Sequence, residues 1–145
     1  MKLLFRKLSS KAVLPVRATP DSAGADLCAC LETPVTIAPG ETVMIPLGLT
    51  CQPTRKDIAL LVFPRSGLAS KHGITLANAV GVVDSDYRGE WHVPLHNISA
   101  MPFTVEHGMR VAQLVVTPVL FPEMLETDTI DETARGAGGF GSSGI

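Results

Sequence analysis

Short apolar runs alternate with turn-forming residues along most of the chain, at a spacing of roughly 8–12 residues that is typical of strands in all-β proteins. The runs cover residues 2–8, 13–16, 35–37, 41–45, 58–63, 75–83, 91–97, 103–105 and 111–119. Residues 58–63 are apolar without interruption, which predicts a strand buried on both faces. Only residues 68–72 predict a helix, and it would be a single turn. The pattern therefore predicts an all-β sandwich or barrel.

Residues 78–89 read N-A-V-G-V-V-D-S-D-Y-R-G, a strand-forming run that breaks into a polar turn before apolar residues resume at Trp91. This order predicts a β-hairpin with 75–83 and 91–97 as its arms. The turn carries two carboxylates, a phenol and a guanidinium. Asp84 and Asp86 can accept a proton or hold a metal, and Tyr87 offers a flat face for stacking. An ordinary solvated turn has a similar composition, so these residues alone do not decide between the two interpretations.

Composition narrows the class of protein. A chain of 145 residues with 46% hydrophobic residues and a net charge of -2 fits one domain with a substantial core. No basic patch is present, so we expect no direct binding to nucleic acid. No run reaches the ~20 apolar residues of a membrane helix. The first eight residues do not resemble a signal peptide.

Three cysteines, an odd number, favour a reducing, intracellular and therefore cytoplasmic location over a disulfide framework. Cys28 and Cys30 would lie on the same side of a strand, and we expect them to be small buried hydrophobic residues. The four histidines have no zinc-ligand spacing, which predicts structural or solvated roles.

The chain changes character after Pro122. Residues 123–132 are acidic, and glycine dominates from Arg135 onward. This composition predicts a folded domain over residues 1–122 and a mobile arm over 123–145. A flexible end without a function is one interpretation. Arg135 and Phe140 favour another, because they supply a phosphate-binding fork and a stacking face among accessible backbone N–H groups.

Five motifs in order make the chain similar to the trimeric dUTP diphosphatase (dUTPase) family. They are A-G-A-D-L at 23–27, P-R-S-G-L at 64–68, G-V-V-D-S-D-Y-R-G at 81–89, R-V-A-Q-L at 110–114 and R-G-A-G-G-F-G-S-S-G at 135–144. The resemblance covers most of the chain. It implies a distorted jelly roll, a homotrimer with active sites between subunits, and hydrolysis of dUTP to dUMP and diphosphate. That reaction limits uracil incorporation into DNA and supplies dUMP for dTMP synthesis.

The resemblance also implies roles for the residues around the third motif. Asp84 matches the catalytic aspartate that orients and deprotonates the water attacking the α-phosphorus, whereas Asp86 would fix the turn or pair with an arginine. Tyr87 matches the residue that stacks under the deoxyribose and excludes a 2′-hydroxyl. Asn78 would meet the uracil edge with its amide. Gly81 would let the backbone approach the base.

The phosphates and the metal are assigned to the other motifs in the same way. Asp26 resembles the aspartate that holds Mg²⁺ through a bound water, although it could instead cap a turn. Arg65, Ser66 and Gly67 resemble a phosphate-binding loop, in which Arg65 would orient the site or pair with a carboxylate. Gln113 is a polar residue within an apolar strand and therefore needs a partner, which the family provides as a phosphate oxygen.

The arm would complete the site from a neighbouring subunit. Arg135 would bind the phosphates and Phe140 would cover the uracil. Ser142 and the N–H groups around Gly139 and Gly141 would reach the γ-phosphate. Closure of such an arm excludes water from the site.

Two other functions are compatible with the fold. A related deaminase acting on dCTP would need a glutamate and a water at the exocyclic amine of the base. A nucleotide-dependent regulatory protein would bind dUTP and respond through ordering of the arm.

Overall fold

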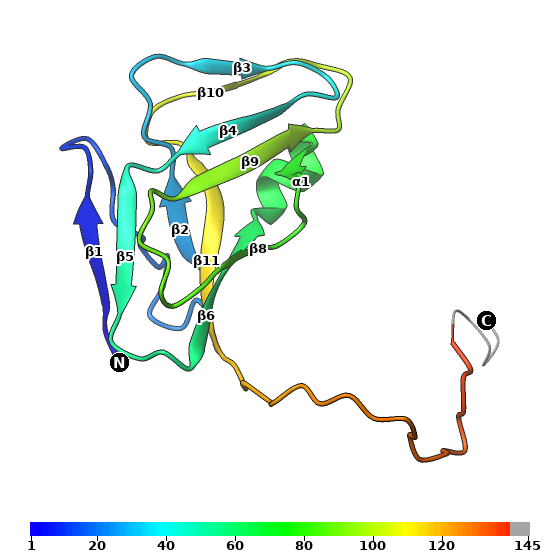
Figure 1. Cartoon of the computed structure of the whole chain (residues 1–145). Coiled ribbons are helices and arrows are strands. Elements are labelled where there is room, and N and C mark those ends of the chain that lie inside the picture. The colour runs from blue at the N-terminus through cyan, green and yellow to red at the C-terminus, as the bar shows by residue number, and fades with distance from the viewer. Residues whose placement is uncertain (140–145) are drawn as a thin grey trace.

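The computed structural model describes residues 1–139, which form eleven short strands and one helix (Figure 1). The strands are β1 (Leu3–Lys7), β2 (Ala25–Cys28), β3 (Val35–Ile37), β4 (Thr42–Pro46), β5 (Leu49–Pro53), β6 (Ile58–Pro64), β7 (Ile74–Leu76), β8 (Gly81–Val83), β9 (His92–Asn97), β10 (Phe103–Val105) and β11 (Arg110–Pro118), and the helix is α1 (Ser66–His72). The predicted all-β class is therefore confirmed, and the architecture is a distorted jelly roll.

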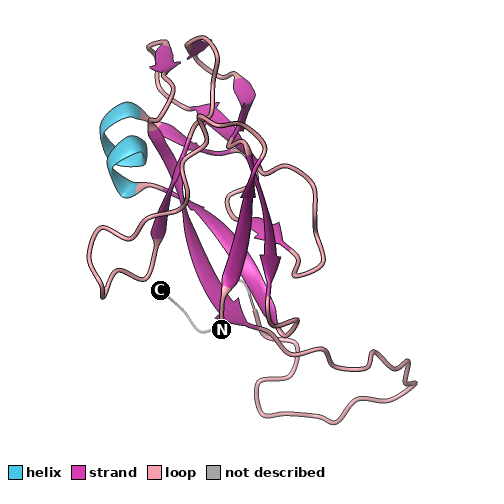
Figure 2. Cartoon of the chain, turned by 90° about the vertical axis from the view of Figure 1, so that its left-hand side faces the viewer, coloured by secondary structure: helices cyan, strands magenta, loops and turns pink. Residues whose placement is uncertain are grey.

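The strands pair antiparallel in four small sheets grouped around a common interior (Figure 2). The sheets have the orders β1-β5, β10-β3, β2-β11-β6-β8 and β4-β9-β7. In the four-stranded sheet, β6 pairs with β11 along its whole length, from Ile58 opposite Pro118 to Pro64 opposite Ala112. As predicted, most residues of β6 are buried. Strand β6 is therefore an inner strand of this sheet, paired with β11 on one side and with β8 on the other.

Alternation along the other strands determines which side chains enter the core. On β9, Val93 and Leu95 are buried, whereas His92 points outward. On β2, Leu27 is buried. Because successive side chains of a strand point to opposite faces, a shift of one residue in the pairing would expose this whole set. The fully buried aliphatic side chains also include Ile37, Ile45, Leu47, Leu49, Leu60, Ile74, Val105 and Val111.

The predicted hairpin with arms 75–83 and 91–97 is only half correct. Residues Ile74–Leu76 pair with β9, but Gly81–Val83 pair with β6 in a different sheet. The chain changes sheets at a tight turn, where Ala79 has a φ of 60° and the Val80 N–H donates to the Asn78 carbonyl at 2.6 Å. A uniform apolar pattern cannot reveal such a turn, because both strands have the same period.

Three other local predictions were wrong or incomplete. Residues 13–16 form no strand and contribute one bridge, between Val16 and Asp26. Cys28 and Cys30 are partly exposed, because Leu27 and Ala29 occupy the inward positions of this segment, whereas Cys51 is buried. The predicted helical turn is a seven-residue helix that begins at Ser66, directly after Arg65.

Beyond β11 the chain leaves the sheets. All residues from 120 to 137 are exposed, and the trace runs away from the strands (Figure 1). The division at residue 122 and the mobility of the arm remain predictions. Within residues 1–139, no helix is both long and apolar enough to cross a membrane.

Asn97 is a completely buried amide that holds the end of β9. Its Nδ2 donates to the carbonyls of Ile37 (3.0 Å) and Met101 (2.8 Å). Its Oδ1 accepts from the backbone N–H of Ser99 at 2.9 Å and from the hydroxyl of Ser99 at 2.7 Å. One side chain thus satisfies polar groups of β3 and of the turn that follows β9.

We expect Asn97→Ala to lower the free energy of unfolding by about 2–4 kcal/mol, because it leaves buried carbonyl and N–H groups without partners. Chemical denaturation at one fixed protein concentration measures the change. Thr36→Ala, which removes an exposed hydroxyl pair with Thr104, is the control and should change stability by less than about 0.5 kcal/mol. Equal effects of the two substitutions would contradict the role given to Asn97.

Candidate functional site

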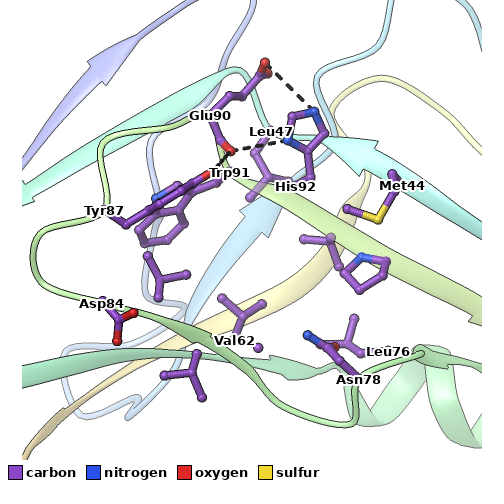
Figure 3. Close-up of a pocket in the computed structure, with 15 residues that line it drawn as sticks. Met44, Leu47, Val62, Leu76, Asn78, Asp84, Tyr87, Glu90, Trp91 and His92 are labelled. Atoms are coloured by element: carbon purple, nitrogen blue, oxygen red, sulfur yellow. Dashed lines mark hydrogen bonds and ion pairs between the residues drawn. The ribbon is translucent and has the colours of Figure 1, made fainter.

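One cavity gathers the residues predicted around the third motif. It has a volume of about 300 Å³, and Asn78, Gly81, Asp84 and Tyr87 all line it. Apolar side chains, including Val62, form its walls. Figure 3 shows Asp84 and Asn78 at opposite ends of the cavity, with Val62 between them. A mostly apolar cavity with a few polar groups at its edges is typical of a small-molecule site.

Asp84 directly follows β8, which fixes its backbone against β6. The residue is exposed, and its carboxylate forms no ion pair within residues 1–139. It is therefore free to accept a hydrogen bond from a water molecule. This is the geometry that a general base requires before the substrate arrives.

Tyr87 is held in one orientation across the opening. Its hydroxyl donates to the backbone carbonyl of Glu90 at 3.1 Å. A Cβ atom at Gly89 would lie 2.3 Å from that hydroxyl, so any other residue at 89 would displace the ring. The absence of a side chain at position 89 is therefore a condition for the position of Tyr87.

Asn78 and Gly81 approach each other at the far end. A Cβ atom at Gly81 would lie 3.4 Å from Nδ2 of Asn78 and 3.3 Å from Cβ of Val62. A Cβ atom at position 81 would therefore touch the amide and require Val62 to shift by a few tenths of an ångström. The glycine thus lets the amide reach into the cavity beside the backbone.

A second cavity, of about 410 Å³, gathers the residues predicted for the phosphates and the metal. Asp26, Arg65, Ser66, Gly67 and Gln113 all line it. They come from β2, from the start of α1 with the residue before it, and from β11. Adjacent pairing of β2, β11 and β6 brings them together, because Gln113 lies opposite Asp26 on one side and Phe63 on the other.

Two arginines hold Asp26. Arg65 Nε donates to Oδ1 at 2.8 Å, and Arg110 Nη1 contacts Oδ2 at 3.3 Å. Of the alternatives for Arg65, the structure therefore shows pairing with a carboxylate. The sequence did not identify Arg110 as a site residue, although it is the first residue of the fourth motif. With one carboxylate between two guanidinium groups, this cavity carries net positive charge and suits an anion.

Magnesium would have few direct protein ligands here. Within residues 1–139, no group of three or more His, Cys, Asp or Glu side chains could hold a metal ion. Both oxygens of Asp26 already face arginines. Mg²⁺ keeps several waters and readily takes phosphate oxygens as ligands. The residues present therefore fit an ion held by Asp26 through water, with the substrate supplying the direct contacts.

Gln113 has one side-chain N–H already bonded, and Cys28 of β2 carries a thiol with low reactivity. Gln113 Nε2 donates to the carbonyl of Pro64 at 2.9 Å, so the partner found for this strand glutamine belongs to the same chain. Burial, reinforced by the negative charge of Asp26, raises the pKa of the Cys28 thiol. Cys28 is therefore protonated near neutral pH and is a poor nucleophile.

The two cavities share no lining residue. None of the residues of the arm up to 139 lines either cavity, and Arg135 instead donates through Nε to the carbonyl of Gly138. The remaining predicted arm residues, Phe140, Gly141 and Ser142, lie outside the described residues. A single chain thus presents two separate partial sites.

Glu90, Trp91 and His92 line the first cavity without having been predicted as site residues. Trp91 is almost fully buried and packs edge-on against Phe5, with ring centroids 5.7 Å apart. In the sequence, only its position after a polar turn could have indicated that Trp91 lines the cavity. A tryptophan of a strand in the core can occupy the same position, so this signal does not separate the two roles.

We expect Asp26→Ala to lower the free energy of unfolding by about 1–2 kcal/mol, between the values for exposed and buried ion pairs. The cause is the loss of the only carboxylate between Arg65 and Arg110. The difference should shrink in 1 M NaCl, where the Debye length is about 3 Å. Denaturation at both salt concentrations measures it.

The control is Glu32→Ala, which breaks the exposed pair with Lys11. It should have a smaller effect at low salt. A loss for Asp26→Ala that does not depend on salt would show that packing, and not charge, explains its contribution.

Comparison with known proteins identifies the family of the chain. The sequence model of the dUTPase family matches residues 10–144. Deoxyuridine 5′-triphosphate nucleotidohydrolase from Shewanella sediminis is 48% identical over 144 residues, which are 99% of this chain and 95% of the relative. The protein of the same name from Desulfitobacterium hafniense is 48% identical over 145 residues, 100% of this chain and 96% of the relative.

Solved structures agree in fold. A variant of the Staphylococcus bacteriophage 80alpha dUTPase with dUpNHpp superposes with a TM-score of 0.90 at 24% identity, over 99% of each chain. A variant of the dUTPase from phage phi11 of S. aureus, described with a coordinated structural Mg(II) ion, has a TM-score of 0.82 at 21% identity, over 91% of this chain and 100% of the other. The family predicted from the five motifs is confirmed: the chain belongs to the dUTPase family.

Proposed function

We propose that this protein hydrolyses dUTP to dUMP and diphosphate as a homotrimer with active sites between subunits. One observation carries the proposal: the predicted residues that precede the arm divide between an apolar cavity with a free aspartate and a basic cavity, and no residue lines both. A nucleoside triphosphate needs both environments together. Because two copies of the chain can supply one each, a symmetric assembly explains the separation.

The first cavity would bind the nucleoside. Uracil would lie at the end near Asn78 and Gly81, where an amide offers a donor and an acceptor and the backbone is accessible. The deoxyribose would rest on Tyr87. Fixed by its hydroxyl bond to Glu90, this ring would leave no room for a 2′-hydroxyl.

Asp84 would orient the nucleophile. Its free carboxylate would accept a hydrogen bond from a water molecule and aim the oxygen of that water at the α-phosphorus. As the oxygen attacks, the carboxylate would take a proton from the water. The bond between the α-phosphorus and the oxygen that bridges to the β-phosphate would then break. Diphosphate leaves with that oxygen, and dUMP keeps the oxygen of the water. Positioning of this water accounts for much of the rate enhancement, because phosphoryl transfer requires little covalent chemistry from the protein.

The second cavity, from a neighbouring subunit, would bind the phosphates. The Ser66 hydroxyl and the Gly67 N–H would contact the α- and β-phosphates, together with the second N–H of the Gln113 amide, the first being bonded to the Pro64 carbonyl. Arg65 would remain paired with Asp26 and orient the loop. Mg²⁺, held through water by Asp26, would neutralise charge on the triphosphate. The arm would add Arg135 and close the site, as lids do in other enzymes.

The deaminase alternative is disfavoured by the same geometry. It needs a glutamate that is free to act at the base. Glu90 is the glutamate in the cavity, but its Oε1 accepts a hydrogen bond from the N–H of Gly48 at 3.1 Å. Ammonia release from dCTP would establish that activity.

A substrate comparison tests the proposed function. With Mg²⁺ present, we expect diphosphate release from dUTP at a kcat/KM at least about 100-fold above the values for dTTP, dCTP and UTP, since a rigid pocket that rejects misfitting groups discriminates by about this factor. Steady-state diphosphate assays measure it. Comparable turnover of all four nucleotides would contradict the pocket described above.

A mixing experiment tests the division of the site. Asp84→Asn should lower turnover by at least about 100-fold, the usual contribution of a positioned base. Arg65→Ala should also lower turnover strongly through the other cavity. Co-refolding equal amounts should restore about a quarter of wild-type activity, because a quarter of the sites then combine two intact cavities in a randomly mixed trimer.

Binding of a non-hydrolysable dUTP analogue, followed by fluorescence of the single tryptophan Trp91, should survive Asp84→Asn. Each variant refolded alone is the control and should stay inactive. Absence of recovery on mixing would show that both cavities of one chain serve the same site.

A further inference from the structure

The turn that carries Asp84 and Tyr87 has almost no backbone support. Within residues 1–139, the only backbone–backbone hydrogen bond made by residues 84–90 joins Tyr87 N–H to the Asp84 carbonyl within the turn itself, at 3.1 Å. The turn ends at Trp91, whose N–H donates to the Leu49 carbonyl of β5 at 2.9 Å. Between β8 and this bond, side chains fix the turn to the rest of the described chain.

Two of the anchors meet strand β5. The hydroxyl of Thr50, a buried residue, donates to the Arg88 carbonyl at 2.8 Å. Arg88 Nη1 donates to the carbonyl of Cys51 in β5 at 3.5 Å, and within the turn to the carbonyls of Ser85 and Tyr87, both at 2.9 Å. These contacts fix the outer side of the turn, away from the cavity.

Glu90 fixes the side that faces the cavity. Its Oε1 accepts from the Gly48 N–H at 3.1 Å, and its backbone carbonyl accepts from the Tyr87 hydroxyl at 3.1 Å. The same residue thus joins the ring of Tyr87 to the turn between β4 and β5. Figure 3 shows Glu90 and Tyr87 on the same side of the cavity, with their hydrogen bond.

We propose that Glu90 is a positioning residue that sets the preference for deoxyribose by holding the ring of Tyr87. The proposal rests on the proposed function, in which Tyr87 lies under the sugar. The important property of Glu90 is the reach of its side chain to the Gly48 N–H. The Glu90 carbonyl shares its peptide plane with the Trp91 N–H, which donates to the Leu49 carbonyl at 2.9 Å. Loss of the Gly48 contact would free the Cα end of this peptide, tilt the carbonyl and let the ring move away from the 2′ position.

The length of the side chain separates this role from a general effect of charge. Glu90→Gln keeps the reach and the acceptor oxygen but removes the charge. Glu90→Asp keeps the charge but shortens the side chain by one methylene. Asp86→Ala is the matched control, since Asp86 is an exposed acid on the same turn and has no ion pair within residues 1–139.

We expect Glu90→Asp and Glu90→Ala to reduce the ratio of kcat/KM for dUTP to that for UTP by about tenfold, which corresponds to about 1.4 kcal/mol of discrimination. Most of the change should come from faster use of UTP and a higher KM for dUTP, with kcat for dUTP altered by less than about threefold because Asp84 is untouched. Glu90→Gln and Asp86→Ala should stay within about threefold of the wild-type ratio.

Tyr87 is the only tyrosine, so selective ¹³C labelling of tyrosine gives a readout that needs no turnover. We expect its ring resonance to shift or broaden in Glu90→Asp and to match the wild type in Glu90→Gln. An unchanged resonance and ratio in Glu90→Asp would overturn the proposal. So would a loss of discrimination in Glu90→Gln equal to that in Glu90→Asp, because charge and not reach would then decide it.

The two proposals can fail separately. A wild-type protein without activity on dUTP would refute the proposed function, while the tyrosine resonance would still report whether Glu90 holds the ring. Normal hydrolysis of dUTP with no effect of Glu90→Asp would refute only the positioning role. If Glu90→Ala fails to fold, the comparison of Glu90→Asp with Glu90→Gln still decides between the outcomes.

Discussion

The antiparallel pairing of β6 with β11 is the constraint on which both cavities depend. Strand β11 aligns Gln113 with Asp26 of β2 on one side and with β6 on the other. The end of β6 delivers Arg65 to the basic cavity, while its middle, around Val62, holds Gly81 of the apolar cavity. A slip of one residue in this pairing would turn the inward side chains outward and displace both cavities together.

The turn that carries Asp84 and Tyr87 depends on a different kind of contact. Strands support Asp84 only up to Val83. Beyond that point, hydrogen bonds between a side chain and the backbone replace strand pairing: the Thr50 hydroxyl of β5 donates to the Arg88 carbonyl, and the Gly48 N–H donates to the Glu90 carboxylate. Such contacts allow a loop to bring a carboxylate and an aromatic ring into one cavity without extending a sheet over it. The arrangement follows the general rule that reactive groups lie on loops held by a rigid scaffold.

The sequence predicted the class of fold, because the spacing of apolar runs and turns reflects the period of strands. It also identified Asn78, Asp84 and Tyr87, which the structure places in one cavity. It did not reveal that the chain changes sheets at Ala79, since β7 and β8 have the same alternation. Nor could it identify Glu90 or Arg110, because their importance comes from contacts with residues 42 and 84 positions away in the chain. Motifs mark the groups that meet a substrate, whereas the residues that hold them are set by tertiary contacts.

Separation of the two cavities has a consequence for cells that make two forms of this chain. Consider a mutant that has lost both Asp84 and Arg65 but still assembles with normal copies. Under the proposed assembly, each such chain inactivates two sites, because it supplies one cavity to each of them. An equal mixture of mutant and normal chains therefore keeps about a quarter of its sites active, whereas sites made by single chains would leave half of them active. Inheritance of the defect would then be partly dominant, although the mutant protein has gained no activity of its own.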